Sequence, residues 1–289
     1  MPDRTGGAYR WSGRAPGGRS LCGDHSGPGG GKFVMVAAPA LAELREVCQP
    51  QAKLQSRNGE HWAGRLYMRA VSLRTTRQLV RTSVSPNTLT WVMVVCGVGG
   101  GAALLIPGLT GAVLAAVLFQ LFLLFDCVDG EVARWKRQFS MAGVYVDRLG
   151  AYLADAALMI GAGVRAARGG SDLWVSAGLA AALGVVLLKA STDLVDVARA
   201  RSGQAPADEE STQPRSQGIA TARRLASIFK IHRVTNGIEA SLVLLAAAVV
   251  DAGLHNLDAT RWTLAGIAVI TWGMVVAHLA SILSSSRLR

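Results

Sequence analysis

Six long apolar runs place the tightest limit on what this chain can fold into. Each run has about 17–21 residues, close to the ~20 that an α-helix needs to cross a hydrocarbon core of ~30 Å. A backbone exposed to lipid must satisfy its own hydrogen bonds, so such runs are expected to be helical. The sequence therefore predicts an all-α fold, an integral membrane bundle of six transmembrane helices. The predicted crossings are residues 89–107, 109–125, 144–164, 173–190, 236–254 and 263–283.

Composition and charge narrow the class of partner. Hydrophobic residues make up 51% of the chain and charged residues only 17%, compared with ~25% charged residues in an average soluble domain. The net charge of +11 would also suit a protein that binds nucleic acid. The long uncharged runs favour membrane lipid instead, because anionic headgroups attract basic loops at the cytoplasmic surface. We therefore expect membrane lipid, and no nucleic acid, as a partner.

The chain divides into three predicted parts. Residues 1–37 are rich in Gly, Arg, Ser and Pro and lack an apolar period, which is typical of a disordered leader. An alternative is a misassigned start, with Met35 as the true first residue. Residues 38–84 are predicted to form cytoplasmic or interfacial amphipathic helices, and residues 85–285 the six-helix membrane domain.

A basic stretch before the first crossing predicts an amphipathic surface helix. Between residues 65 and 81, arginines alternate with Leu66, Leu73 and Leu79 at near-helical spacing. Such a helix lies on a membrane with its apolar face in the interface and its basic face toward headgroups. The arginines are Arg65, Arg69, Arg74, Arg77 and Arg81.

Lysine and arginine counts predict the orientation in the membrane. With the N-terminus in the cytoplasm, residues 65–81, 134–137 and 199–233 bring most of the basic side chains inside, whereas the outer loops hold few. This asymmetry is the one expected for cytoplasmic loops. We therefore expect a multi-pass protein of the cell (plasma) membrane. The few outer arginines are Arg165, Arg168 and Arg261.

Three acidic residues at the inner ends of the second and third crossings point to chemistry. Asp126 and Asp129 are three residues apart, so they share one helix face, and Asp147 begins the next crossing. Facing lipid, the three would cost roughly 8–10 kcal/mol together. They are therefore expected to line a polar pocket. Carboxylate oxygens suit hard cations such as Mg²⁺ or Mn²⁺.

The residues between these acids suit a phosphate ligand. Gly130 would let the backbone approach a ligand closely, and Ala133 leaves space beside it. Arg134 presents a planar guanidinium that pairs well with phosphate oxygens.

The segment resembles the signature of the CDP-alcohol phosphatidyltransferase family. The resemblance rests on the type and spacing of Asp126, Asp129, Gly130, Ala133, Arg134, Gly143 and Asp147, and on Ser85-Pro86-Asn87-Thr88-Leu89-Thr90 upstream. It implies a six-helix bundle, commonly a homodimer, with its site at the cytoplasmic end. It also implies that Asp126, Asp129 and Asp147 bind Mg²⁺ or Mn²⁺ and carry the catalysis. Gly130, Ala133, Arg134, Gly143, Asn87 and Thr90 would then bind the CDP group.

The resemblance also implies a reaction in phospholipid biosynthesis. An alcohol hydroxyl would displace CMP from a CDP-linked donor. CDP-diacylglycerol is the expected donor, and a small polar alcohol or its phosphate the acceptor. The reverse arrangement, with a CDP-linked head group as donor, fits the same motif.

One position departs from the family pattern. Ala151 stands where the family has a fourth Asp, a residue that the resemblance makes both metal ligand and base. Alanine supplies neither function. Asp155 is a poor substitute, because eight helical residues separate it from Asp147 by ~12 Å and turn it by ~80°. A non-catalytic nucleotide- or lipid-binding relative is the alternative, and a small cation transporter, which Arg134 disfavours, is a third.

Overall fold

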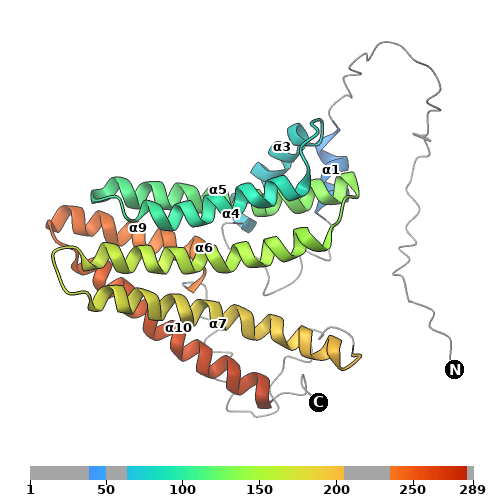
Figure 1. Cartoon of the computed structure of the whole chain (residues 1–289). Coiled ribbons are helices and arrows are strands. Elements are labelled where there is room, and N and C mark those ends of the chain that lie inside the picture. The colour runs from blue at the N-terminus through green and yellow to red at the C-terminus, as the bar shows by residue number, and fades with distance from the viewer. Residues whose placement is uncertain (1–38, 50–63, 205–234, 285–289) are drawn as a thin grey trace, which may run out of the picture. The chain divides into compact units, whose positions relative to one another are not determined.

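The described part of the chain is helical and contains no strand. A computed structural model of the protein describes residues 39–49, 64–204 and 235–284 (Figure 1). The predicted leader, residues 1–37, and residues 50–63 lie outside these ranges. The helices are α1 (Leu41–Cys48), the π-helix η1 (Gly64–Met68), α3 (Arg69–Leu79), α4 (Pro86–Ala103), α5 (Gly108–Lys136), α6 (Met141–Ala167), α7 (Leu173–Arg201), α9 (Gly237–Leu254) and α10 (Asp258–Ser284).

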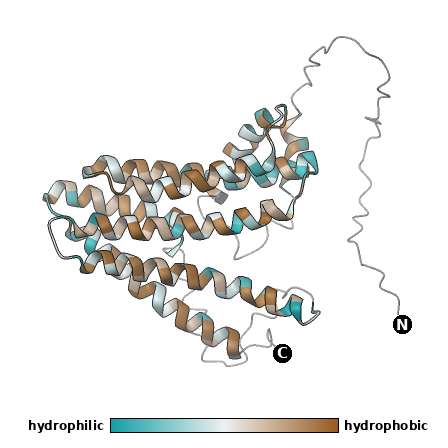
Figure 2. Ribbon diagram, in the orientation of Figure 1, coloured by the Kyte–Doolittle hydropathy of each residue, from teal (hydrophilic) through white to brown (hydrophobic). Residues whose placement is uncertain are grey.

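The long helices confirm the prediction of a helical membrane bundle. Five of the described helices, α5, α6, α7, α9 and α10, are long and apolar enough to cross a membrane, and hydrophobic residues run along most of their length (Figure 2). The first predicted crossing corresponds to α4, which has 18 residues and begins with Pro86, Asn87 and Thr88. These polar residues and four glycines lower its hydropathy, so six crossings stay a prediction.

Several helices extend beyond their apolar runs. α5 continues from the predicted end at residue 125 to Lys136, and α7 continues from residue 190 to Arg201. Backbone hydrogen bonds sustain a helix whether or not its side chains are apolar, so hydropathy alone places the ends too early. α5 ends where Arg137 adopts a left-handed conformation, with φ of 53°. The complete acidic motif, residues 126–134, therefore lies on one rigid helix.

Glycines allow α4 to pack closely against its neighbours α5 and α6. A Cβ atom added to Gly97 would lie 2.4 Å from the Cβ of Ala154, and one added to Gly101 would lie 2.3 Å from the carbonyl carbon of Ala157. Both distances are far below van der Waals contact. Small residues thus bring the backbones of α4 and α6 together, as is usual in membrane bundles.

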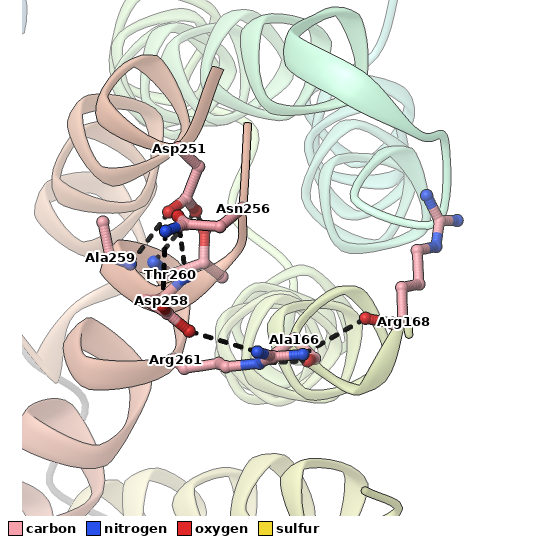
Figure 3. A network of polar contacts seen from close by, with 8 residues as sticks. All are labelled: Ala166, Arg168, Asp251, Asn256, Asp258, Ala259, Thr260 and Arg261. Atoms are coloured by element: carbon pink, nitrogen blue, oxygen red, sulfur yellow. Dashed lines mark hydrogen bonds and ion pairs between the residues drawn. The ribbon is translucent and has the colours of Figure 1, made fainter. Parts of the chain in front are cut away.

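The end of the bundle away from the acidic motif is held by a polar network (Figure 3). Asp251, buried near the end of α9, accepts hydrogen bonds from the amides of Ala259 and Thr260 at 2.8 and 3.0 Å. It thereby caps α10 from a different helix. Arg261 donates to the carbonyl oxygens of Ala166 and Arg168 at 3.0 and 3.2 Å, which fixes α10 to the end of α6.

The predicted amphipathic helix forms, but its buried face differs from the expected one. Leu73 is buried, whereas Leu66, which lies in η1, is 74% exposed. The residues that turn inward with Leu73 are polar, Ser72 and Thr76. Their hydroxyl groups donate hydrogen bonds to the buried carboxylate of Glu131 on α5. These hydrogen bonds, more than the spacing of the leucines, determine which face of α3 is buried.

Candidate active site

One cavity of about 370 Å³ gathers every site residue that the sequence predicted. Its walls come from the start of α4, the last third of α5 and the first turns of α6. The predicted residues in its lining are Asn87, Thr90, Asp126, Asp129, Gly130, Ala133, Arg134, Gly143 and Asp147.

The three carboxylates share this cavity but differ in their surroundings. Asp129 is only 8% exposed; it accepts a hydrogen bond from the hydroxyl of Thr90 at 2.7 Å and one from the amide of Gly130 at 2.5 Å. Asp126, one turn earlier on α5, is exposed, and Asp147 on α6 is half-buried. The cavity therefore has one carboxylate held rigidly and two that are more accessible.

The start of α4 is built to place Asn87 and Thr90. Ser85 caps the helix by accepting a hydrogen bond from the amide of Thr88 at 3.2 Å, and Pro86 occupies the first helical turn, where its missing amide proton is not needed. This cap orients the next turn of the helix. Thr90 consequently points at Asp129, and Asn87 points at the start of α6.

A second cap joins α6 to α4. Ser140 accepts a hydrogen bond from the amide of Gly143 at 2.9 Å and donates one to the side-chain oxygen of Asn87 at 3.0 Å. A Cβ atom on Gly143 would lie 2.7 Å from that oxygen. Gly143 therefore leaves room for the close approach of Asn87.

Arg134 is held over Gly130 by a contact from the N-terminal region. Its Nε donates to the carbonyl oxygen of Cys48, at the end of α1, at 2.7 Å. One terminal nitrogen lies 3.2 Å from where a Cβ atom on Gly130 would stand. The guanidinium group is thus fixed along the cavity wall.

The donor set of the cavity suits a hard divalent cation. Three carboxylates from two helix ends line one hollow, and carboxylate oxygen is the ligand that Mg²⁺ and Mn²⁺ prefer. Over the described residues, no three His, Cys, Asp or Glu side chains are gathered into a ready-made metal site. The lining therefore fits such a cation in chemistry, without a closed set of ligands.

Ala151 and Asp155 lie outside the cavity lining that the described residues form. The Ala151 carbonyl oxygen accepts a hydrogen bond from Lys189 Nζ at 3.2 Å. Asp155, 3% exposed, forms an ion pair with Lys189 at 2.6 Å and accepts a hydrogen bond from the Gly237 amide at 3.0 Å. Asp155 thus joins α6, α7 and α9, and it does not replace the missing carboxylate.

The sequence reading missed several residues of the lining. Arg69 was assigned only to the basic surface helix, yet it lines the cavity beside Arg134. Ser140 had no motif around it, although a serine just before a helix is a usual capping signal. No local pattern distinguishes Arg69 from the other arginines between residues 65 and 81. Gln138, Phe139 and Val144 also line the cavity.

Three of the matches to known proteins describe what this chain is similar to. Residues 83–207 match the family described as CDP-alcohol phosphatidyltransferase. The bifunctional IPC transferase and DIPP synthase of Thermococcus kodakarensis is 28% identical over 193 residues, which cover 65% of this chain and 41% of that protein. The chain thus spans less than half the length of this relative. The solved apo structure of phosphatidylinositol phosphate synthase from Mycobacterium tuberculosis matches with a TM-score of 0.49 and 19% identity, over 75% of this chain and 98% of that chain.

Proposed function

We propose that this chain, whose residues 83–207 match the CDP-alcohol phosphatidyltransferase family, transfers a phosphatidyl or related phospho-alcohol group from a CDP-linked donor to an alcohol, with release of CMP. The observation that carries this proposal is the convergence of the signature residues, from three helices, on one cavity. The matched segment, residues 83–207, contains all of them.

The bonds that change are those of a substitution at phosphorus. The hydroxyl oxygen of the acceptor bonds to the donor phosphorus, the bond from that phosphorus to the CMP oxygen breaks, and CMP leaves with the electron pair. The hydroxyl proton passes to another group of the site or to bound water, because Ala151 offers no acceptor for it. Arg134 holds phosphate oxygens through its planar group.

Asp126, Asp129 and Asp147 are the residues that would hold Mg²⁺ or Mn²⁺. Such a cation, when bound, offsets negative charge on the diphosphate and on departing CMP. Thr90 orients Asp129 through the 2.7 Å hydrogen bond.

Donor, acceptor and location follow from the same reasoning. We take CDP-diacylglycerol as the donor and a small polar alcohol or its phosphate as the acceptor. The basic residues cluster at the end of the helices that carries the cavity, which supports a plasma-membrane protein with its active site toward the cytoplasm. A homodimer is proposed from the family resemblance alone.

A non-catalytic relative is the second candidate, because Ala151 places a methyl group where the family has an acid. Purified full-length protein with Mg²⁺ separates the two candidates when CMP release is measured over pairs of CDP donors and alcohols. An enzyme releases CMP only with the matching pair, whereas a binding protein retains CMP affinity without turnover.

Substitution of the acids tests the site itself. Asp126→Asn and Asp129→Asn should each abolish CMP release, since both remove charge from the cavity. Asp172→Asn is the matched control, because Asp172 is an exposed carboxylate before α7, at the other end of α6 from the site. Asn variants that release CMP at the wild-type rate would show that the acids do not form the metal site.

A further inference from the structure

Glu131 is a buried carboxylate within the acidic motif that the proposed chemistry does not use. It is 0% exposed on α5, and its two oxygens accept three hydrogen bonds. Gln49 and Ser72 donate to Oε1 at 2.8 and 2.7 Å, and Thr76 donates to Oε2 at 2.7 Å. Burying a charge in this way is favourable only when such partners are present. All three donors belong to the region before the first crossing, so Glu131 clamps that region to α5.

We call Glu131 and its three donors the Glu131 clamp; the donors are Gln49, Ser72 and Thr76. This clamp positions Arg69 relative to α5. Arg69, Ser72 and Thr76 follow the spacing of one face of α3. The second amide proton of Gln49 goes to the carbonyl oxygen of Arg69 at 3.1 Å. The backbone of Arg69 is therefore fixed against α5, and its side chain lines the cavity.

A second tie comes from α1 and concerns Arg134. The Cys48 carbonyl accepts from Arg134 Nε at 2.7 Å, and the Cys48 thiol donates to the Glu131 carbonyl at 3.4 Å. Burial raises the pKa of the Cys48 thiol to about 11, so the thiol stays protonated and able to donate. The region before the first crossing thus holds the Arg134 guanidinium directly and fixes the backbone from which the Arg69 side chain reaches the cavity.

We infer that Arg69 is a second phosphate-binding guanidinium for the CDP-linked donor, and that Glu131 is the positioning residue that holds it in place. This inference rests on the proposed function. A diphosphate entering a cavity with three carboxylates meets like charge, and the two guanidinium groups in the same lining counter it. Arg74, further along α3, is exposed and is not part of the lining. Arg69 therefore differs from Arg74 in where its side chain lies, although both belong to the same basic helix.

The alternative role for Arg69 is general attraction to anionic lipid, which every arginine of a basic surface helix shares. The two roles differ in what they predict. A phosphate ligand in the cavity depends on Arg69 alone, whereas attraction to lipid depends on the total charge of the helix. Arg74→Gln is therefore the matched control, since it removes the same charge from the same helix.

The experiment uses full-length protein in nanodiscs with Mg²⁺ and two readouts. Binding of CMP and of CDP-diacylglycerol is measured by calorimetry, and the KM of the donor is compared with kcat by CMP release. Arg69→Gln should weaken binding about 10- to 100-fold, the loss expected for a charge-assisted hydrogen bond. Arg69→Lys should recover part of it, and Arg74→Gln should stay within twofold of wild type.

Glu131→Gln tests the positioning role. It should weaken donor binding in the wild-type background and add little in the Arg69→Gln background, because both changes remove one function. Arg69→Gln keeps the clamp, since Gln49 donates to the backbone carbonyl of Arg69; Glu131→Gln, which weakens the clamp, should therefore lower the melting temperature more than Arg69→Gln does.

The outcomes separate this inference from the proposed function. An active wild type whose Arg69→Gln variant binds CMP equally well overturns the inference alone, as does an Arg74→Gln variant that loses as much as Arg69→Gln. A wild type that neither binds CMP nor releases it overturns both.

Discussion

Replacing Gly143 with alanine tests whether the contact between the starts of α4 and α6 shapes the cavity. The added Cβ atom would lie 2.7 Å from the Asn87 side-chain oxygen and 2.9 Å from the Ser140 hydroxyl. Ordinary van der Waals contact begins near 3.4 Å, so Asn87 must move by about 0.7 Å or rotate away.

The expected loss of stability follows from the hydrogen bond that the movement of Asn87 breaks. The Ser140–Asn87 hydrogen bond, now 3.0 Å long, would be lost at a cost of about 0.5–1.5 kcal/mol of stability. Activity should suffer more, because Asn87 lines the cavity and a misplacement of ~1 Å near reacting groups costs up to ~100-fold in rate.

The assay compares CMP release and thermal unfolding of purified Gly143→Ala and Gly273→Ala. Gly273 lies in α10, and a Cβ atom there would meet nothing within 4 Å. The control should keep full activity and gain roughly 0.5–1 kcal/mol of helix stability, whereas Gly143→Ala should lose most of its activity with a small fall in melting temperature. A Gly143→Ala protein as active as the control would refute the reasoning.

Two further predictions concern the residues around Ala151. Ala151→Asp should raise CMP release severalfold if the missing acid limits proton removal. Ala156→Asp is the control, because it adds an acid elsewhere on α6. No gain in CMP release would indicate that the site works without a carboxylate at position 151. Lys189→Met should lower the free energy of unfolding by about 3–5 kcal/mol, because Asp155 would stay buried without the Lys189 ammonium group that now lies 2.6 Å away. An unchanged denaturation midpoint would show that this ion pair does not stabilise the fold.

The acidic motif was readable from the sequence because its information is local. Asp126 and Asp129 share a face at a spacing of three, and the structure places both on α5 with Gly130, Ala133 and Arg134. Apolar runs likewise report where lipid or a protein interior surrounds a helix, so the helices could be found. Their ends could not, because a helix continues into polar sequence until a residue such as Arg137 ends it.

Glu131 shows where such a reading fails. The residues beside it in the sequence do not identify its partners, because Gln49, Ser72 and Thr76 lie 82, 59 and 55 residues away. Hydropathy predicted that the leucines of this helix face the membrane interface, whereas Leu73 turns into the protein together with Ser72 and Thr76. The buried carboxylate of Glu131 draws Ser72 and Thr76 inward, and the hydrophobic spacing within α3 does not predict this contact with α5.

The sequence by itself determined that this chain is a helical membrane protein, and which acids, glycines and arginine make up its signature. Those features depend on transfer from water to lipid and on spacing along one helix, both of which are local. Only the tertiary structure decided that Arg69 joins the cavity, that Asp155 binds Lys189 and not the site, and that Gly143 makes room for Asn87. These are contacts between helices, and packing sets them because each buried polar group must find its partner wherever the fold brings one.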